Sequence, residues 1–344
     1  MVITSYYNIT SRLKEAWLTF EQQDGVSPFM YYGYLKNVFN HRRLLGIFRG
    51  IVPVIKCVED TNCAILAIAP LVYNIFSKKY RMLGDIRGCG KADFLYKCGL
   101  SWQECVTCCN LILNGLGEKI YLHRVPEESV LAACPKERNL SVEQKDSCDI
   151  KIADDYNMWF SNLSSSVRQN IRTAYNRMKR DQCDFNVIIM GNEKSFDSKL
   201  TPISRKIYRE CLDMYVNRQL TKYHNKGVRI KRIMRGLRYK YIKFDSTSLY
   251  SDSNAILVAL QINGTLAAYM GAFSSYDGKS VVVPRLAIDE NFKFYSPGYL
   301  MLCEVIKFLT ENTEVESLDL SRGLEKYKMD LGAVPYKCFN FSRK

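Results

Sequence analysis

One stretch near the middle of the chain has apolar residues at helical spacing. The apolar positions are Val167, Ile171, Ala174, Tyr175 and Met178. Intervals of three and four residues predict an amphipathic helix, and Ser161 or Ser164 is suited to cap its first turn. The opposite face of this helix is basic, and we take Arg168 and Arg172 on it as candidate substrate-binding residues.

Runs of consecutive apolar residues, typical of buried strands, follow this helix. They lie at 185–190, 255–262, 265–273, 280–288 and 317–320. Asn263-Gly264 separates two of the runs and predicts a hairpin closed by a type I′ turn. Helices are predicted at about 203–222 and at 298–309. Strands and helices in this order predict a mixed sheet of the α/β or α+β class.

The first half of the chain shows a weaker version of the same pattern. Apolar runs that predict strands lie at 44–48, 51–57 and 63–69. The first two flank Arg49-Gly50 and are predicted to form a hairpin or two close strands, and Pro70 is expected to end the third. A helix over 101–115, capped by Ser101, is predicted before a short strand at 120–124.

A polar and charged stretch at 136–151 separates the two halves, and we interpret it as a junction. The chain has 344 residues, which exceeds one ordinary domain of roughly 100–200 residues. We therefore predict two domains, 1–150 and 151–344. The similar order of elements is compatible with two copies of one fold in tandem.

Basic residues outnumber acidic ones, with 49 Lys and Arg against 35 Asp and Glu and a formal net charge of +14. Such a charge favours an anionic partner, which can be nucleic acid, a membrane surface or a phosphorylated small molecule. Ten of the basic residues lie at 214–244, where no acid occurs. We interpret this stretch as a surface for an anionic or phosphorylated small molecule or glycan, and a solvated helix face is the alternative.

Composition and cysteine content bound the class of protein. With 47% hydrophobic residues, the chain is not generally disordered. It shows no secretory signal, and its longest apolar run, 63–72, is shorter than the roughly 20 residues that span a bilayer. We therefore expect a cytoplasmic protein without a membrane span.

The 13 cysteines are expected to be reduced. The densest group, Cys98, Cys105, Cys108 and Cys109, is expected on a core helix without metal, with zinc as the alternative.

The turn Tyr295-Ser296-Pro297-Gly298 stands between a predicted strand and a predicted helix. The start of a helix offers unpaired N–H groups and positive potential, and a glycine there allows a phosphate to approach the backbone closely. We assign cofactor binding to this turn. The assigned residues are Ser296, Gly298, Tyr299 and Leu300. An ordinary Pro-Gly turn is the alternative reading.

Ionisable side chains gather directly after the last predicted strand. Asp319, Arg322, Glu325, Tyr327 and Lys328 fall within ten residues. Charged groups at a strand end beside a phosphate-type turn are well placed to bind a substrate. A charged, solvated exit loop is the alternative.

These features together resemble the Gcn5-related N-acetyltransferase (GNAT) superfamily. The segments that carry the resemblance are 163–172, the hairpin 257–272, the Ser296-Pro297-Gly298 turn and 319–328. The branch it resembles is the BioF2-like or CelD/BcsL-type acetyltransferases, close to the FemAB peptidyltransferases. The resemblance covers about residues 155–335 and implies a tandem GNAT-like fold. In such a fold a splayed mixed sheet holds an acyl-CoA, and the first of the two copies is degenerate.

The turn at 293–298 departs from the glycine-rich turn of the superfamily, which includes Arg or Gln. This departure leaves aminoacyl-tRNA, the donor of the FemAB relatives, as an alternative to acetyl-CoA or another acyl-CoA.

The resemblance also implies a reaction, the direct attack of an amine on a thioester. Asp319 and Glu325 are the candidate bases, and Tyr295 and Tyr327 the candidate acids. Arg285, Arg322 and Lys328 are taken to hold phosphate or carboxylate groups of the substrate.

The expected activity is an acyl-CoA-dependent N-acyltransferase, acting on an amino sugar or related amine in surface-polysaccharide synthesis. The alternatives are a FemAB-like aminoacyl-tRNA-dependent peptidyltransferase, with tRNA as partner, and a non-catalytic nucleic-acid-binding protein.

Overall fold

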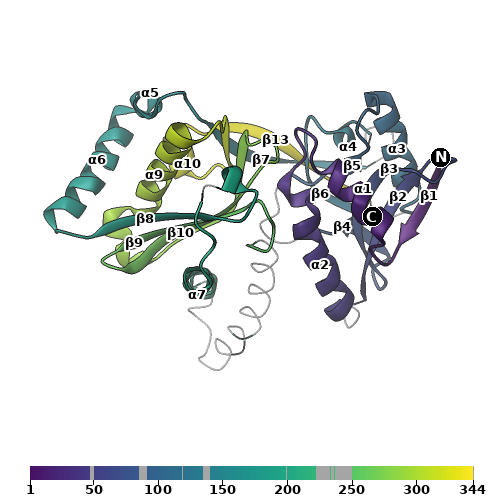
Figure 1. Cartoon of the computed structure of the whole chain (residues 1–344), viewed down its shortest axis with the longest axis horizontal. Helices are drawn as coiled ribbons and strands as arrows, with labels where there is room; N and C mark the ends of the chain where they lie inside the picture. The colour runs from purple at the N-terminus through teal and green to yellow at the C-terminus, as the bar shows by residue number, and fades with distance from the viewer. Residues whose placement is uncertain are drawn as a thin grey trace. The chain divides into compact units, whose positions relative to one another are not determined.

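The strands and helices of the chain are shared between two units, shown as a computed structural model in Figure 1. The structure describes residues 1–46, 50–84, 91–117, 119–134, 140–198, 200–221, 233, 236 and 250–343. One unit consists of Met1–Ser147 and Pro335–Lys344, and the other of Cys148–Val334. The sequence-based boundary at residue 150 falls inside a strand, β7 (Ser141–Lys151). The chain thus returns to its first unit at the end.

The first unit is built on strands in the order β1-β2-β3-β4-β6-β13, with β5 beside β3. Its strands are β1 (Val2–Tyr6), β2 (Ile51–Glu59), β3 (Ile65–Asn74), β4 (Lys79–Met82), β5 (Leu95–Tyr96), β6 (Lys119–Pro126) and β13 (Val334–Arg343). Its α-helices are α1 (Ser11–Phe20), α2 (Tyr32–Leu45), α3 (Trp102–Asn114) and α4 (Val130–Ala133).

The second unit has the strand order β12-β11-β10-β9-β8, and β7 lies beside β12. Its strands are β8 (Phe185–Gly191), β9 (Ala255–Ile262), β10 (Thr265–Ser274), β11 (Ser280–Ile288) and β12 (Ser317–Arg322). Its α-helices are α5 (Tyr156–Asn162), α6 (Ser165–Arg180), α7 (Arg205–Thr221), α9 (Pro297–Asn312) and α10 (Lys326–Asp330).

The two units repeat one topology. In the first, β1 to β4 are antiparallel neighbours, and the chain then passes through α3 to β6, which pairs parallel to β4. In the second, β8 to β11 are antiparallel neighbours, and the chain passes through α9 to β12, parallel to β11. This repeat confirms the prediction of a mixed sheet in two tandem copies.

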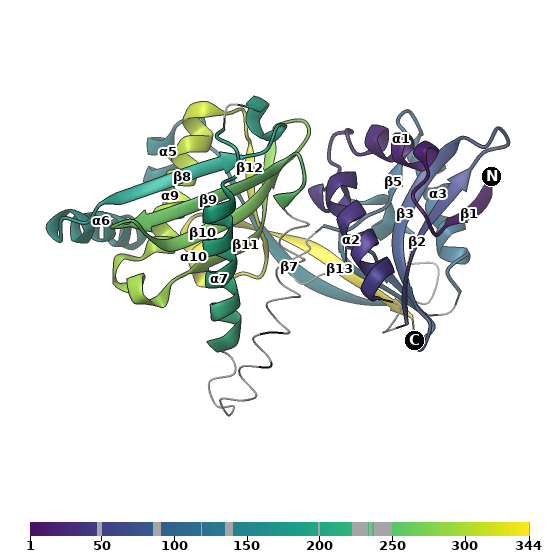
Figure 2. The same ribbon diagram turned by 60° about the horizontal axis from the view of Figure 1, so that its bottom comes forward.

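Alternating residues of β9 and β10 build a core on each face of the second sheet. Ile256 and Val258 pack in the cluster that includes α6 and α9, whereas Leu257 and Ala259 pack in the cluster that includes α7. Figure 2 shows α7 crossing one face of the sheet, with α6 and α9 on the other. The hairpin between β9 and β10 turns at Asn263 and Gly264, both with positive φ, as a type I′ turn requires.

Two strand predictions in the first half are wrong in part. Leu44 and Leu45 end α2 rather than begin a strand, since a short apolar run cannot be assigned to helix or strand by its pattern alone. Residues 47–49 lie outside the described residues.

Pro70 lies inside β3, where it pairs with Ile55. On the other side of β3, the pairing with β5 ends at Ile68 and the pairing with β4 begins at Leu71. Pro70 lies between these two ladders, so its lack of an N–H breaks no hydrogen bond of either.

The helix boundaries predicted from caps are confirmed. The side chains of Ser101 and Ser164 accept hydrogen bonds from the first turns of α3 and α6. The cysteines of α3 lie on its buried face, as expected, whereas Cys98 is exposed. In the described part of the chain, no three His, Cys, Asp or Glu side chains lie together so that they could hold a metal ion.

Two strands were not predicted from the sequence. Part of the polar stretch 136–151, interpreted as a junction, forms β7, and the end of the chain forms β13. No helix among the described residues has the length and apolar character needed to cross a bilayer.

Candidate active site

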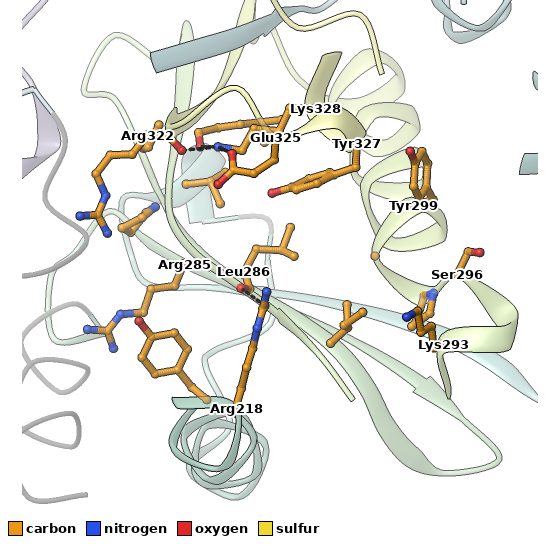
Figure 3. A pocket seen from close by; sticks show the side chains of 18 residues that line it. Arg218, Arg285, Leu286, Lys293, Ser296, Tyr299, Arg322, Glu325, Tyr327 and Lys328 are labelled. Atoms are coloured by element: carbon orange, nitrogen blue, oxygen red, sulfur yellow. Dashed lines mark hydrogen bonds and ion pairs between the residues drawn. The ribbon is translucent and has the colours of Figure 1, made fainter. Parts of the chain in front are cut away.

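The second unit has a cavity of about 640 Å³ where β11 and β12 separate. The two parallel strands are paired at three positions, which end at Val282 and Asp319. Beyond these residues the cavity opens between 283–288 of β11 and 320–322 of β12 (Figure 3). Because the strands diverge there, backbone and side-chain groups of both become accessible to a bound molecule.

A β-bulge shapes the β11 wall of this cavity. Gly271 of β10 pairs with Arg285, but Phe273 pairs with Val282, so β11 contains an extra residue around Val283 and Pro284. Bulges redirect side chains and end regular pairing. Pro284 has no backbone N–H, which reduces the donors that this wall can offer.

The turn before α9 forms one end of the cavity. Lys293, Ser296, Gly298 and Tyr299 line it, whereas Leu300 is fully buried in the core. Ser296 has a positive φ of 52°, and its carbonyl accepts the N–H of Tyr299 at 3.0 Å. The N–H of Gly298 has no backbone partner in the described part of the chain. The turn thus presents one N–H, one hydroxyl and one ammonium group to an anion.

Lys328 fixes the turn between β12 and α10. Its side chain is 4% exposed, and its Nζ donates to the carbonyls of Leu320 at 3.0 Å, Gly323 at 3.3 Å and Arg322. The same ammonium forms an ion pair with Glu325 at 2.9 Å. These bonds make Lys328 a support for the cavity wall rather than a freely moving charge.

Glu325 and Tyr327 face the cavity from this turn with opposite electrostatic properties. Burial raises the pKa of Glu325, but the hydrogen bond from Lys328 and the nearby positive charges hold it below its usual value overall. Burial raises the pKa of Tyr327 to about 12, and the negative charge of Glu325 adds to this effect. At neutral pH, Glu325 is therefore ionised and Tyr327 is a protonated phenol, which can act as an acid.

A hydrogen-bond chain ties α10 to α9. The hydroxyl of Tyr299 donates to Oδ2 of Asp330 at 2.8 Å, and Lys326 binds the same carboxylate at 2.8 and 2.9 Å. These hydrogen bonds link α10, which carries Tyr327, to α9, which begins at the phosphate-type turn.

Cationic side chains dominate the cavity wall. Arg218, Arg285, Lys293, Arg322 and Lys328 all line it. The guanidinium of Arg285 lies 4.9 Å from the ring of Tyr215, and Arg218 donates to the carbonyl of Leu286 at 3.1 Å. Such a wall attracts an anionic ligand.

The structure adds Arg218 to the residues chosen from the sequence. Arg218 belongs to the basic stretch at 214–244, so the sequence pointed to its surroundings but not to the residue. Most of that stretch, from residue 222 on, lies outside the described residues apart from 233 and 236.

Four other residues chosen from the sequence do not line the cavity. Asp319 is buried, and its Oδ1 accepts the N–H of Ser321 at 2.7 Å. Tyr295 donates to Asp181 at 3.0 Å, at the end of α6. Arg168 binds the carbonyls of Ser161 and Leu163 at the start of α6, and Arg172 lies 5.6 Å from the ring of Phe160.

A second cavity, of about 670 Å³, adjoins the first and shares Arg218 and Ile288 with it. Its carboxylates are Glu210, Asp213, Asp289 and Glu290. The two cavities thus differ in charge, and the first is the one suited to an anion.

Comparison with known proteins agrees with this geometry. Residues 246–329 match the family model of the acetyltransferase (GNAT) domain. No curated protein matches the chain.

Solved structures match over nearly the whole chain at low identity. The C-terminal domain of a putative lysylphosphatidylglycerol synthetase from Agrobacterium fabrum is 11% identical, with a TM-score of 0.55 over 97% of this chain and 92% of that one. A conserved protein of unknown function from Bacteroides thetaiotaomicron is also 11% identical, with a TM-score of 0.54 over 96% of both chains. FemX is 10% identical, with a TM-score of 0.52 over 99% of this chain and 97% of its own.

The matched segment contains the hairpin, the diverging strands, the turn before α9 and most of α10. The likeness to solved structures extends the fold to both units. The second unit therefore contains a segment that matches the GNAT domain, and the chain as a whole has the fold of these solved structures.

Proposed function

We propose that the second unit is an acyl-CoA-dependent N-acyltransferase that transfers an acyl group, such as acetyl, to an amine. The observation that carries the proposal is the cavity between the diverging strands, which has a phosphate-type turn at one end and the phenol of Tyr327 in its wall. A thioester that spans the cavity would place its phosphates at the turn and its acyl group between β11 and β12.

The residues present can serve each step of such a transfer. Lys293, Ser296 and Gly298 hold phosphates, because they offer an ammonium, a hydroxyl and an unpaired N–H. The amine nitrogen forms a bond to the acyl carbon, and the carbon–sulfur bond breaks with its electron pair going to sulfur. Tyr327 gives the thiolate a proton, and Glu325 or water takes the proton that the amine loses.

The basic wall indicates the kind of acceptor. Arg218, Arg285 and Arg322 lie outside the phosphate-type turn, on other elements of the cavity wall. They suit an acceptor that carries phosphate or carboxylate groups besides its amine. A phosphorylated amino sugar, or a related precursor of a surface polysaccharide, has both groups, and we propose this class as the acceptor.

One observation favours a second donor, an aminoacyl-tRNA. Pro297 has no N–H, and the N–H of Tyr299 is used by Ser296, so the turn offers few backbone donors to a pyrophosphate. An aminoacyl-tRNA, the donor of a FemAB-like peptidyltransferase, has no pyrophosphate to bind at this turn. Binding of aminoacyl-tRNA with a steep salt dependence, in place of acyl-CoA, would support this alternative.

Calorimetric binding of acetyl-CoA tests the donor, together with thioester consumption in the presence of phosphorylated amino sugars. We expect binding, and about tenfold weaker binding by Lys293→Met, because the lysine gives a charge-assisted bond to phosphate. Lys307→Met is the matched control, since Lys307 is exposed on α9 away from the cavity. The proposal would be contradicted if no acyl-CoA showed binding and none showed turnover.

The pH dependence of kcat/KM tests Tyr327 as the acid. Its pKa, raised to about 12 chiefly by burial, keeps the phenol protonated far above neutral pH. The acceptor amine must be neutral to attack, so kcat/KM should rise with pH to a plateau and show no falling limb below about pH 10. A falling limb near neutral pH would show that a group of lower pKa supplies the proton.

A further inference from the structure

The hydroxyl of Ser321 is buried where β12 parts from β11, and it has no hydrogen-bond partner among the described residues. Ser321 is 4% exposed, its Oγ is unpaired, and it lines the cavity between the two strands. Burying an unpaired hydroxyl is unfavourable unless a bound molecule supplies the partner. The unpaired Oγ therefore points to a polar atom of the substrate at this place.

The backbone holds Ser321 in a conformation that few serines adopt. Its φ is +56°, in the left-handed region where a side chain crowds its own backbone. The N–H of Ser321 donates to buried Asp319, and Lys328 binds the carbonyls of the residues on either side, Leu320 and Arg322. Strained residues that neighbouring bonds over-determine in this way are characteristic of functional sites.

The β11 wall of the cavity contains a proline. Pro284 and Ser321 both line the cavity, and each lies two residues beyond the last paired residue of its strand, Val282 or Asp319. A backbone N–H of β11 would otherwise be the natural donor to a carbonyl oxygen bound between the strands, but Pro284 has none. The hydroxyl of Ser321, on the β12 wall of the same cavity, is a hydrogen-bond donor.

We propose that Ser321 is a catalytic residue whose hydroxyl donates a hydrogen bond to the carbonyl oxygen of the bound acyl group. The proposal rests on the proposed acyl transfer and deepens it by naming the donor to the oxyanion. When the amine attacks, the π electrons of the carbonyl move onto oxygen, and the Ser321 hydroxyl stabilises that charge. When the carbon–sulfur bond breaks, these electrons re-form the carbonyl, and Ser321 keeps its proton throughout.

The first test compares kcat of the wild type and Ser321→Ala at saturating acetyl-CoA. We expect kcat to fall about 100-fold, the loss typical of one oxyanion donor. Thermal stability should stay the same or rise, because alanine removes an unpaired buried hydroxyl. Ser317→Ala is the matched control: Ser317 is on the same strand, does not line the cavity, and donates to Asp149 at 2.8 Å. A kcat of Ser321→Ala close to that of the control overturns the proposal.

The second test needs no turnover and compares two non-reactive donors by calorimetry. One is S-acetonyl-CoA, which has a carbonyl group, and the other is S-propyl-CoA, which has none. The wild type should bind the ketone about tenfold more tightly, and Ser321→Ala should lose this preference. A preference that persists in Ser321→Ala, or none in the wild type, overturns the role of Ser321. If neither compound binds the wild type, the acyl-CoA donor itself is wrong, and the proposal for Ser321 falls with it.

Discussion

Tyr327→Phe is expected to lower kcat by about 10²- to 10⁴-fold while leaving acyl-CoA binding unchanged, because phenylalanine keeps the ring but removes the proton donor. Tyr327 lines the cavity, and its raised pKa keeps it protonated at the pH at which the thiolate leaves. Figure 3 shows its ring projecting from α10 towards the space between the strands. Steady-state kinetics with an amine acceptor, together with calorimetric binding of CoA, measure the two effects separately.

Tyr295→Phe serves as the discriminating variant for Tyr327→Phe. The two tyrosines are equivalent candidates in the sequence, but Tyr295 is hydrogen-bonded to Asp181 and does not line the cavity. We expect its variant to keep kcat within about twofold of the wild type, as for a surface substitution. The reverse result, a large loss for Tyr295→Phe and little for Tyr327→Phe, would move the acid to the end of α6.

A third experiment uses an activated acyl donor, whose leaving thiol has a low pKa and needs no acid. Tyr327→Phe should be slow with acetyl-CoA but nearly normal with this activated donor. Such a recovery would support Tyr327 as the proton donor, because only the protonation step would have been bypassed. Equal losses with both donors would instead indicate a role of Tyr327 in positioning.

The elements of the second unit could be predicted from the sequence because local signals agree there. Apolar spacing, a serine cap and an Asn-Gly turn each act over a few residues, and α6 with the β9–β10 hairpin forms where they predicted. Pro70 misled the prediction because the effect of a proline depends on which side of the strand is paired. That side is set by β4 and β5, which come later in the chain.

The candidate site was predictable only in part for a similar reason. Residue types that bind anions mark the turn before α9 and the segment after β12, and several of them line the cavity. The sequence does not show where β11 and β12 separate, so it cannot distinguish Tyr327 from Tyr295. Ser321 carries no signal of its own, since its significance lies in a positive φ and an unpaired hydroxyl.

Lys328→Met is expected to lower the free energy of unfolding of the second unit by about 3 kcal/mol, because each buried carbonyl left without its donor costs about 1–3 kcal/mol. Methionine has a similar length but no donor, so the carbonyls of Leu320, Arg322 and Gly323 lose their shared partner. The Glu325 side chain is 56% exposed, so water can solvate the carboxylate that remains. For a unit of this size, we expect the thermal midpoint to fall by roughly 6–12 °C.

Lys326→Met is the control for Lys328→Met. Lys326 also pairs with a carboxylate on α10, that of Asp330, but its side chain is 85% exposed. An exposed pair of this kind contributes little, so we expect its midpoint to change by about 1 °C. Similar shifts in the two variants would show that the buried bonds of Lys328 do not hold the turn.

The pH dependence of stability gives an independent check on Lys328. Although burial raises the pKa of Glu325, its bond to Lys328 holds that pKa below the usual value. A carboxyl group with a lowered pKa stabilises the fold above its unfolded pKa of about 4.3, and this stabilisation is lost as the pH falls through the folded pKa. Without Lys328 the burial effect remains and the compensating bond is gone, so Lys328→Met should lose less stability than the wild type on acidification through that range. The same loss in both proteins would mean that Glu325 is held by other groups, and that the β12–α10 turn does not depend on this lysine.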